Sequence, residues 1–571
     1  MTPPPACRIC TGVLSLARPG RPGPIAAAAF APSCHEAGAH GDLLRCRECG
    51  TVQQPSLPAG EELVGLYREM TDTAYLEQEA GRRQTVRRLL ELVGAHVPAG
   101  RLLEVGCGHG LLLDEAARLG YEVTGLEPAR QAAAHARERY GLDVRELTVD
   151  DPSLDEERFD VVVMADVLEH VENPCAALDR CTSLLAEGGV MLIVTPDPSS
   201  ATARLAGARW WGFLPGHVCL LPHRTLLELL IGRGLLIAAD VPLVRSFTPG
   251  YWAKGLGERS RMVSRLAERV ERHAGDRLWS LTLGDERAVL ARRVTVQLPE
   301  RPLASLRGRE HVVCAVLPAY NATRTIARVA EEMPTDAIDR ALVVDDASPD
   351  ETTSASLAAG FEVLRHPSNR GYGANQKSCY VRAALDGADI VVMVHGDNQY
   401  DPALVGAMVK PIEEGRADVV IGSRLLKDEA IAGGMPRWKW VGNRFLTRIE
   451  NAAFGHDYSE YHTGYRAFSV DFLRTIAFTR NNDDFVFDQQ IFAQITARGA
   501  RVVELAIPTR YFLEASSVSF GDSVVYGLKT LGVLARYRLN RRRRGGWALL
   551  RQPAIRLEPV ASFSTATHRV A

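Results

Sequence analysis

Three glycines and two acids in the first half of the chain have the spacing of a nucleoside-binding loop. Gly106, Gly108 and Gly110 follow a short apolar run and precede a helical pattern, so the backbone can approach a ligand closely and present amides to it. Glu127 closes the next apolar run, where a carboxylate can accept both hydroxyls of a ribose. The order G-x-G-x-G after Glu104 differs from the dinucleotide fingerprint G-x-G-x-x-G.

A second group of polar residues closes apolar runs in the C-terminal half. Asp345 and Asp346 end one run, and Pro318, Tyr320 and Asn321 end the run before it. Adjacent acids at the carboxyl edge of a parallel sheet can hold the base and the ribose of a nucleotide. These residues therefore predict a second nucleotide site, separate from the first.

An oxygen-rich loop follows a further, strongly apolar run. His395, Asp397 and Gln399 alternate along this loop. Carboxylate and amide oxygens suit a hard cation such as Mg²⁺ or Mn²⁺, and imidazole can also ligate Mn²⁺. We expect a metal ion here that bridges a diphosphate and neutralises the charge on a leaving nucleotide.

Two C-x₂-C pairs near the start of the chain have metal-ligand spacing. Cys7 and Cys10 form the first pair, and Cys46 and Cys49 form the second. Four thiolates on two tight turns are the ligand set of a structural Zn²⁺, whose binding energy can fold a segment with little core. The long gap between the pairs also contains two possible substitute ligands, Cys34 and His35. The alternative interpretation is four unrelated cysteines in a reducing compartment.

Length and composition limit the classes of protein. A chain of 571 residues exceeds what one hydrophobic core supports, so several folding units are expected. Its 67 basic and 69 acidic residues give a net charge of −2, which argues against nucleic acid as a partner. The chain starts without a signal-peptide pattern, and its 11 cysteines do not indicate a secreted disulfide framework. We therefore expect a cytoplasmic protein.

The elements that must position these residues alternate between strand and helix. Two such stretches indicate an α/β protein with two doubly wound domains, which meet near the proline-broken segment 298–308. Apolar spacing also predicts one helix over about 61–96, whereas the first fifty residues read as loops. The expected domain bounds are 1–55 for the cysteine-rich segment, 60–297 and 309–520 for the two α/β domains, and 521–571 for the tail.

The first α/β stretch resembles the class I S-adenosylmethionine-dependent methyltransferases over about residues 85–245. The glycine loop, the segment Asp166–Val171 and the turn Glu187–Gly189 carry the resemblance. It implies that Glu127 binds the ribose and that Asp150 or its neighbour Asp151 lies near the adenine. The residues implied to bind the cofactor are Glu104, Gly106, Gly108, Gly110, Glu127, Asp150 and Asp166. A NAD-binding Rossmann domain is the alternative.

The methyl acceptor is less well defined by the sequence. His217 follows an aromatic loop after the expected fifth strand and is a candidate base, as is His223, although either can be a structural histidine. The cysteine pairs resemble those that precede some sugar C-methyltransferases. A sugar acceptor is therefore expected.

The second α/β stretch resembles the family 2 glycosyltransferases of the GT-A fold, over about residues 311–520, especially the polyprenyl-phosphate sugar transferases. The family's metal motif Asp-x-Asp-x-Gln is present with His395 in place of the first Asp. Later motifs imply that Arg424 and Arg466 face phosphates, and Arg437 lies in the intervening acceptor loop. Asp488 is the candidate base for a hydroxyl acceptor, whereas a phosphate acceptor needs no base.

The tail contains an amphipathic pattern followed by a basic run. Over 524–539 the apolar residues fall largely on one side of a predicted helix, and 541–544 are arginines. This pattern predicts either an interfacial helix at the inner face of the membrane or a helix packed on the catalytic domain. The apolar residues are Val524, Val525, Leu528, Leu531, Leu534 and Leu539.

Together these features predict a bifunctional transferase that builds a methylated glycan or glycolipid. One half would methylate a sugar or glycan with S-adenosylmethionine, and the other would move a hexose from a nucleotide-diphosphate sugar to a glycan or polyprenyl-phosphate acceptor with inversion. Two alternatives remain. In the first, the second half lacks the first metal Asp and binds nucleotide sugar without turning it over. In the second, the whole chain is a non-catalytic scaffold.

Overall fold

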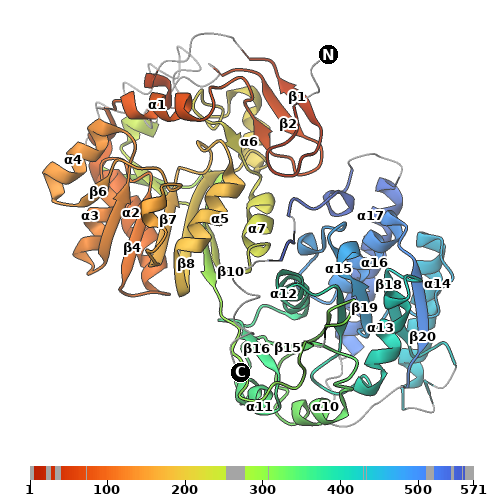
Figure 1. The fold of residues 1–571 in the computed structure, drawn as a ribbon. Helices are drawn as coiled ribbons and strands as arrows, with labels where there is room; N and C mark the ends of the chain where they lie inside the picture. The colour runs from red at the N-terminus through yellow and green to blue at the C-terminus, as the bar shows by residue number, and fades with distance from the viewer. Residues whose placement is uncertain are drawn as a thin grey trace. The chain divides into compact units, whose positions relative to one another are not determined.

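The computed structural model describes residues 5–20, 27–31, 40–72, 74–252, 277–306, 308–427, 430–431, 434–508, 520–541, 546–555 and 557–559. The chain divides into two compact units (Figure 1). Unit 1 comprises 1–230 and 235–293, and unit 2 comprises 231–234 and 294–571. The candidate ligands Cys34 and His35 lie outside the described residues.

Unit 1 is built on a seven-stranded sheet of order β10-β13-β8-β7-β4-β5-β6. The strands from β8 to β6 are parallel, whereas β13 is antiparallel to β8 and β10. β4 lies between β5 and β7, so the loop after β4 opens at the switch point where such sheets bind ligands. The strands are β4 (Arg101–Val105), β5 (Glu122–Leu126), β6 (Asp143–Arg145), β7 (Phe159–Ala165), β8 (Leu185–Pro196), β10 (Leu235–Pro242) and β13 (Glu286–Arg293).

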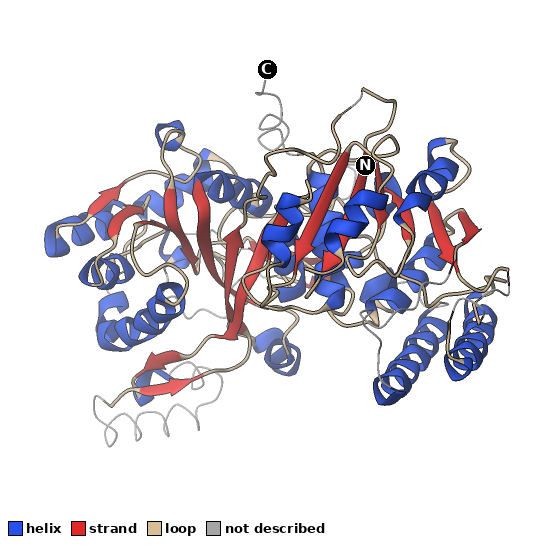
Figure 2. Cartoon of the chain, turned by 90° about the horizontal axis from the view of Figure 1, so that it is seen from below, coloured by secondary structure: helices blue, strands red, loops and turns tan. Residues whose placement is uncertain are grey.

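Helices lie alongside the strands in both units (Figure 2). In unit 1 they are α1 (Glu61–Glu69), α2 (Glu79–Gly94), α3 (Leu111–Arg118), α4 (Arg130–Tyr140), α5 (Pro174–Leu184), α6 (Ala201–Ala206) and α7 (His223–Ile231). The single helix expected over 61–96 is therefore wrong. Met70 has an extended backbone after α1, and the Asp72 carboxylate accepts a hydrogen bond from the Tyr75 amide (3.0 Å), which starts a new turn.

The N-terminal segment is more regular than the sequence indicates. Instead of loops alone, it forms an antiparallel sheet of order β1-β2-β3-β9. The fourth strand comes from far along the chain, and the register pairs Val52 with Leu220. This pairing attaches the cysteine-rich segment to the segment that contains His217. The strands are β1 (Leu14–Arg18), β2 (Leu43–Cys46), β3 (Val52–Gln53) and β9 (Cys219–Leu220), and a separate hairpin of unit 1 joins β11 (Arg245–Phe247) to β12 (Trp279–Leu281).

Unit 2 contains a second seven-stranded sheet, of order β16-β15-β14-β17-β19-β18-β20. Only β19 is antiparallel to its neighbours. β14 lies between β15 and β17, so its loop again opens at a switch point. The strands are β14 (Val313–Ala319), β15 (Arg340–Asp345), β16 (Glu362–Arg365), β17 (Ile390–Met393), β18 (Val419–Ser423), β19 (Arg466–Ser469) and β20 (Val502–Ala506).

The helices of unit 2 complete the predicted α/β architecture. They are α10 (Ile326–Glu332), α11 (Thr352–Ala358), α12 (Tyr372–Leu385), α13 (Val405–Glu413), α14 (Arg437–Phe454), α15 (Val470–Leu473), α16 (Phe487–Arg498) and α17 (Phe520–Asn540). The two predicted α/β stretches are thus both present, each with an antiparallel strand that the sequence did not indicate. Among the described residues, no helix is both long and apolar enough to cross a bilayer.

Helix α17 packs on α14 and α16 through one face. Thr530, Val533, Leu534 and Tyr537 are buried there. Leu534 therefore points inward, in contrast to the expected apolar face, whereas the other five residues predicted for that face are exposed. These are Val524, Val525, Leu528, Leu531 and Leu539.

Candidate functional site

The glycine loop of unit 1 has the conformation that close backbone approach requires. Gly106, Gly108 and Gly110 all have positive φ, and a Cβ on Gly106 would lie 2.6 Å from Val167. Glu127 holds the loop in place: its carboxylate accepts hydrogen bonds from the amides of Gly108 (2.7 Å) and Ala129 (2.8 Å). The predicted loop and the predicted acid thus meet at the ends of β4 and β5.

Glu104 is buried near the end of β4, next to the glycine loop. Its Oε2 atom has no hydrogen-bond partner. Burial, together with the nearby charge of Glu127, raises the pKa of Glu104 well above its usual range. A buried carboxylate oxygen without a partner fits a ligand that carries a positive charge or a hydrogen-bond donor. The ammonium and sulfonium groups of S-adenosylmethionine meet this requirement.

One cavity of about 1400 Å³ contains the loop and most of the predicted cofactor residues. Asp150 lines it, whereas its neighbour Asp151 caps a short helix by accepting a hydrogen bond from the Ser153 amide. Asp166 also lines the cavity and forms an ion pair with Arg245 (2.7 Å). Arg245 was missed by sequence reasoning because it lies 79 residues from its partner. The structure therefore favours Asp150 over Asp151 as a ligand-facing residue.

The predicted base also lines this cavity. His217 is buried beside Glu169 and His170, and its Nδ1 atom lies 2.7 Å from the carbonyl oxygen of Gly212. Burial and the neighbouring His170 lower the pKa of His217 to about 3, so the ring is neutral near pH 7. His223, the other candidate, instead has its Nε2 atom 2.9 Å from a carboxylate oxygen of Asp240.

The four predicted zinc ligands lie together. The Sγ atoms of Cys7 and Cys49 are 3.6 Å apart, and those of Cys10 and Cys46 are 3.4 Å apart. One ligand atom from each of the four side chains lies within 4.8 Å of the others. The amides of Ile9 and Glu48 point at Cys7 and Cys46 (3.4 Å each), as in tight turns that present thiolates. This donor set fits tetrahedral Zn²⁺.

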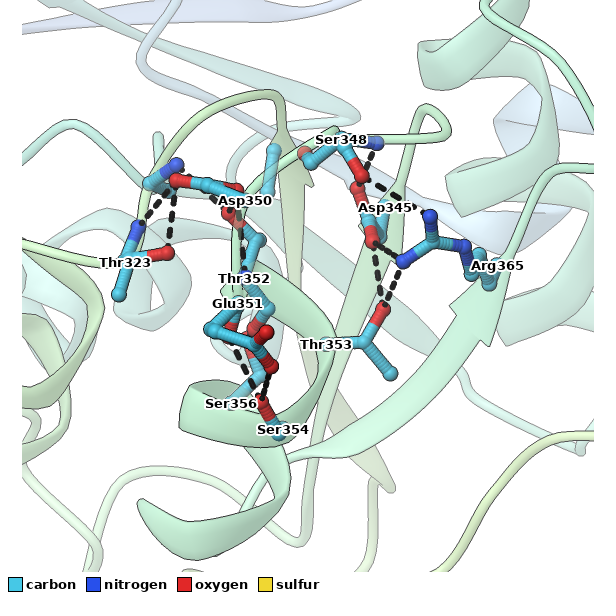
Figure 3. Close-up of polar contacts among 12 residues, drawn as sticks. Thr323, Asp345, Ser348, Asp350, Glu351, Thr352, Thr353, Ser354, Ser356 and Arg365 are labelled. Carbon is cyan, nitrogen blue, oxygen red and sulfur yellow. Dashed lines mark hydrogen bonds and ion pairs between the residues drawn. The ribbon is translucent and has the colours of Figure 1, made fainter.

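In unit 2, the paired acids after β15 are held by neighbouring groups. The Asp345 carboxylate accepts hydrogen bonds from the Ser348 amide (2.9 Å) and from Thr353 Oγ1 (2.5 Å), and it pairs with Arg365 (3.0 Å; Figure 3). Asp345 therefore organises the loop that follows its own strand.

Asp346 organises the next loop. Its carboxylate accepts hydrogen bonds from the amides of Arg370 (2.9 Å) and Gly371 (2.8 Å) and contacts His366 (2.6 Å). Tyr320 is exposed beside these acids, and Asn321 is fixed by a hydrogen bond from its amide to Ser348 Oγ (3.0 Å). Pro318 lies at the end of β14, paired with Val344 of β15.

Two further residues, Asp350 and Thr352, tie the loops after β14 and β15 together. Asp350 accepts hydrogen bonds from Thr323 Oγ1 (2.7 Å) and Thr352 Oγ1 (2.5 Å), as Figure 3 shows. Thr352 Oγ1 in turn accepts one from the Ala322 amide (2.8 Å). Sequence reasoning missed both residues, although the D-x-T spacing before a helix is a recognisable capping signal.

The predicted metal loop follows β17. His395 is partly buried between Tyr372 and Tyr400, with ring centroids 5.8 and 4.9 Å away. A Cβ on Gly464 would clash with Nε2 of His395, so this glycine makes room for the ring. Burial lowers the pKa of His395, partly offset by the charges of Asp397 and Asp488. Asp397 lies two residues away, and its carboxylate accepts a hydrogen bond from the Gln399 amide (3.2 Å).

The predicted base and one predicted phosphate-binding arginine contact each other. Arg466 is fully buried, and its Nη1 atom lies 2.8 Å from Oδ1 of Asp488. Gln376 also donates to this carboxylate (3.0 Å), and the other nitrogen Nη2 of Arg466 donates to the carbonyl oxygen of Tyr461 (3.3 Å). The two sequence motifs therefore build one buried ion pair beside His395.

The other two predicted arginines differ in their surroundings. Arg424 pairs with the buried Glu460, whose carboxylate also accepts hydrogen bonds from the Arg424 amide (2.8 Å) and from Asn443 (2.8 Å). Burial opposes ionisation of Glu460, but Arg424 lowers its pKa overall. Arg437 is exposed at the first turn of α14. Of the three arginines, Arg437 is thus the one that reaches solvent most freely.

Backbone strain marks the same loops. Five non-glycine residues among those described have φ between 55° and 58°, a region that is costly for most side chains. Four of them lie in the loops after the parallel strands β7, β14, β15 and β17, and the fifth, Thr11, lies in the first cysteine turn. The four are Asp166, Asn321, Ala347 and Asn398.

Comparison with known families agrees with this geometry. Residues 76–239 match a family model described as a methyltransferase domain, and residues 314–477 match the family 2 glycosyl transferases. The chain therefore carries a methyltransferase domain followed by a family 2 glycosyltransferase domain. The prediction of an enzyme that joins these two transferase folds is confirmed.

Two curated relatives illustrate the likeness. An O-methyltransferase of ubiquinone biosynthesis from Cereibacter sphaeroides is 43% identical over 117 residues, which cover 19% of this chain and 47% of the relative. The glycosyltransferase AglJ of Haloferax volcanii is 30% identical over 203 residues, which cover 35% of this chain and 63% of the relative. The chain thus spans about half the length of the first relative and less than two thirds of the second.

A solved structure also resembles part of the chain. Glucosyl-3-phosphoglycerate synthase from Mycobacterium tuberculosis, in complex with Mn²⁺, UDP-glucose and phosphoglyceric acid, shares 17% sequence identity. The match covers 43% of this chain and 88% of that protein, with a TM-score of 0.34.

The loop ties of unit 2 lead to a first prediction. Replacing Asp350 with Ala removes acceptors from both loops, at a cost of about 1–3 kcal/mol in local stability. We expect amide hydrogen exchange in residues 320–325 and 346–353 to become about 10–100-fold faster. The control is Glu351→Ala, which changes the exposed neighbouring residue. Equal exchange in the two variants would show that Asp350 does not hold the loops.

Proposed function

We propose that unit 1 transfers a methyl group from S-adenosylmethionine to a sugar or glycan. The observation that carries this proposal is the unpartnered, buried Glu104 oxygen beside the Glu127-anchored glycine loop. Glu127 would accept the ribose hydroxyls and Asp150 would lie near the adenine. The cofactor supplies an activated methyl group when bound. His217 and its neighbours line the same cavity, so an acceptor bound beside them can be oriented toward the cofactor.

Binding of the cofactor tests this proposal. Glu127→Gln leaves one amide nitrogen facing the Gly108 or Ala129 amide and weakens the ribose contact. Since hydrogen bonds to a charged group contribute about 1.5–3 kcal/mol, we expect S-adenosylmethionine to bind about 10–100-fold more weakly in calorimetry of the full chain. Glu122→Gln, at the exposed start of the same strand, is the control. Unchanged affinity in the Glu127 variant would contradict the assignment.

We further propose that unit 2 transfers a hexose from a nucleotide-diphosphate sugar by a single inverting displacement. Pro318, Tyr320, Asn321, Asp345 and Asp346 would form the nucleotide side of the site. His395, Asp397 and Gln399 supply a nitrogen and oxygens, a mixed donor set that suits Mn²⁺ better than Mg²⁺. Such an ion supplies charge neutralisation at the diphosphate when bound.

The acceptor class follows from the surroundings of Asp488. With its carboxylate paired to Arg466, Asp488 would serve as a base only for a hydroxyl acceptor in contact with this pair. A phosphate acceptor needs no base, and the exposed Arg437 offers a bidentate donor to it. We therefore propose a polyprenyl phosphate as the acceptor, with Arg424 and Arg437 at its phosphate.

The metal loop provides the test of turnover. In the full chain with Mn²⁺, we expect Asp397→Asn to lower sugar release from UDP-glucose or GDP-mannose by at least about 100-fold, because a bound metal ion contributes several kcal/mol. Asp471→Asn, an exposed acid paired with Arg474, is the control. If the unchanged protein binds these nucleotide sugars but does not turn them over, unit 2 serves only to bind them. The presence of His395 in place of the first Asp of the metal motif favours this alternative.

A lipid-linked acceptor also requires contact with a membrane, and two packed helices supply an apolar surface for it. On α14, Trp438, Val441 and Phe445 are 43%, 57% and 61% exposed at one-face helical spacing. On α17, which packs against α14, Val525 and Leu528 are 51% and 65% exposed. Basic residues of α14 flank this surface, including Arg437, Lys439, Arg444 and Arg448. We propose that this surface rests on an anionic bilayer.

Vesicle binding tests the membrane contact. We expect the full chain to sediment with phosphatidylglycerol vesicles at low salt, and Phe445→Ser with Leu528→Ser to weaken this binding at least about 10-fold, since each buried side chain contributes about 1.5–3 kcal/mol. Leu205→Ser is the control, because Leu205 is 90% exposed in unit 1. Absence of sedimentation of the unchanged protein would exclude the proposed contact.

We also propose a structural Zn²⁺ at Cys7, Cys10, Cys46 and Cys49. Their convergence at the end of the sheet that includes β9 supports this role. The joint product would be a methylated glycan or glycolipid. Fusion of the two domains favours one pathway, without requiring that both act on one molecule.

A further inference from the structure

Three side chains that line the cavity of unit 1 converge. Glu169 and His170 follow β7, and His217 precedes β9. One ligand atom from each side chain lies within 4.8 Å of the other two. Glu169 and His217 are buried, at 1% and 5% exposed, His170 is half-buried, and all three line the cavity. Sequence reasoning selected only His217.

Backbone hydrogen bonds hold the two segments together. The amides of Val218 (2.8 Å) and Cys219 (3.0 Å) both donate to the backbone carbonyl oxygen of Glu169. The Gln54 side chain donates to the carbonyl oxygen of His217 (2.7 Å) and to that of Leu214 (2.9 Å). The cysteine-rich segment therefore helps to hold the backbone at His217, and the backbone next to His217 is bonded to that of Glu169.

The contacts of the rings determine which nitrogens remain for a ligand. Nδ1 of His217 lies 2.7 Å from the Gly212 carbonyl oxygen, which only accepts, so Nδ1 of this neutral ring carries the proton and Nε2 carries the lone pair. Nδ1 of His170 lies 3.1 Å from the Gly216 carbonyl oxygen and 2.9 Å from the Tyr67 hydroxyl oxygen, and donation from Nδ1 to these oxygens leaves Nε2 of His170 with the lone pair. Backbone carbonyls orient the imidazoles of metal sites in the same way. Glu169 is oriented by Thr195 Oγ1, which donates to Oε2 (2.9 Å).

We propose that Glu169, His170 and His217 bind a divalent transition-metal ion. Two imidazoles and one carboxylate suit Zn²⁺, Mn²⁺ or Fe²⁺ rather than Mg²⁺ or Ca²⁺, and three protein ligands leave a coordination position open. An ion about 2.1 Å from each ligand atom requires the ligand atoms to be about 3.4 Å from one another. They now lie within 4.8 Å of one another, so small side-chain rotations bring them to that separation. The structure thus assigns His217 the role of a metal ligand instead of a general base.

The open position faces the cavity that also contains Gly106 and Gly108. Resting on the proposed methyl transfer, we assign this position to an acceptor hydroxyl. Coordination acidifies the hydroxyl, whose proton goes to water. The oxygen then forms the bond to the methyl carbon, and the electron pair of the broken C–S bond stays on sulfur. The acceptor class is therefore an alcohol, and O-methylation is the expected reaction.

Metal counting on the full chain tests the site without cofactor or acceptor. The apoprotein is titrated with Co²⁺, with absorption spectra and elemental analysis after dialysis. Asp397→Asn is the background for every sample, because it removes the ion proposed for unit 2. In this background we expect two ions per chain: one gives a thiolate charge-transfer band from the cysteine site, and the other adds only weak d–d bands. Glu169→Gln and His217→Ala should each retain one ion with the thiolate band intact. The control is His96→Ala, a histidine of unit 1 outside the cluster, which should retain two.

The outcomes separate the metal site from the reaction. One ion per chain in the Asp397→Asn background, or two ions in both cluster variants made in that background, would overturn the site. Glu169→Gln is nearly isosteric, so it decides the result if His217→Ala fails to fold. If the ion is present but Zn²⁺ or Mn²⁺ does not restore methyl transfer to the chelated enzyme, the assignment of the open position to the acceptor is wrong, while S-adenosylmethionine binding still reports on the proposed function.

Discussion

The loops that leave the parallel strands must satisfy backbone amides that no strand pairs with, and buried carboxylates do this in both units. Glu127 accepts hydrogen bonds from two amides of unit 1, and Asp346 accepts two in unit 2. Glu460 accepts the amide of Arg424. An unpaired buried amide is costly and a charged acceptor makes a strong bond, so these acids determine the loop shapes on which both sites depend.

This constraint gives several acids two functions. A carboxylate that receives amides from its own protein is already held in place when a ligand arrives, so binding pays little ordering entropy. Glu104 is the exception, because one of its oxygens is buried without a partner. Glu104 therefore keeps an oxygen with no hydrogen-bond partner, whereas the carboxylate of Glu127 accepts two loop amides and shapes the loop. Strained residues such as Asp166 and Asn398 lie in the loops after two other parallel strands, β7 and β17, where tightly held loops can maintain an unfavourable φ.

The N-terminal segment shows how a small module can act on a distant site. Pairing of β3 with β9, together with the Gln54 side chain, connects the four cysteines to the loop of His217. A short antiparallel edge pair of this kind has little stability alone. Its stability in this protein comes from burial of Trp210, Phe213 and Leu220 against Val52. The cysteine-rich segment and the loop of His217 are therefore packed together within unit 1.

The sequence alone determined the features that depend on neighbouring residues. Strand–helix alternation, the glycine loop with Glu127 and the two cysteine pairs could be located because their signals lie within a few residues of each other. Tertiary structure decided the rest: the antiparallel β13 and β19, the pair of Arg466 with Asp488, and the convergence of Glu169 with His217. Arg466 and Asp488 are 22 positions apart, Glu169 and His217 are 48 positions apart, and β13 and β19 pair with strands from other parts of the chain. Which of these groups meet depends on how whole helices and strands pack. The spacing of residues along the sequence does not predict that packing, because side chains of the same type at the same spacing can face a ligand, a partner or solvent.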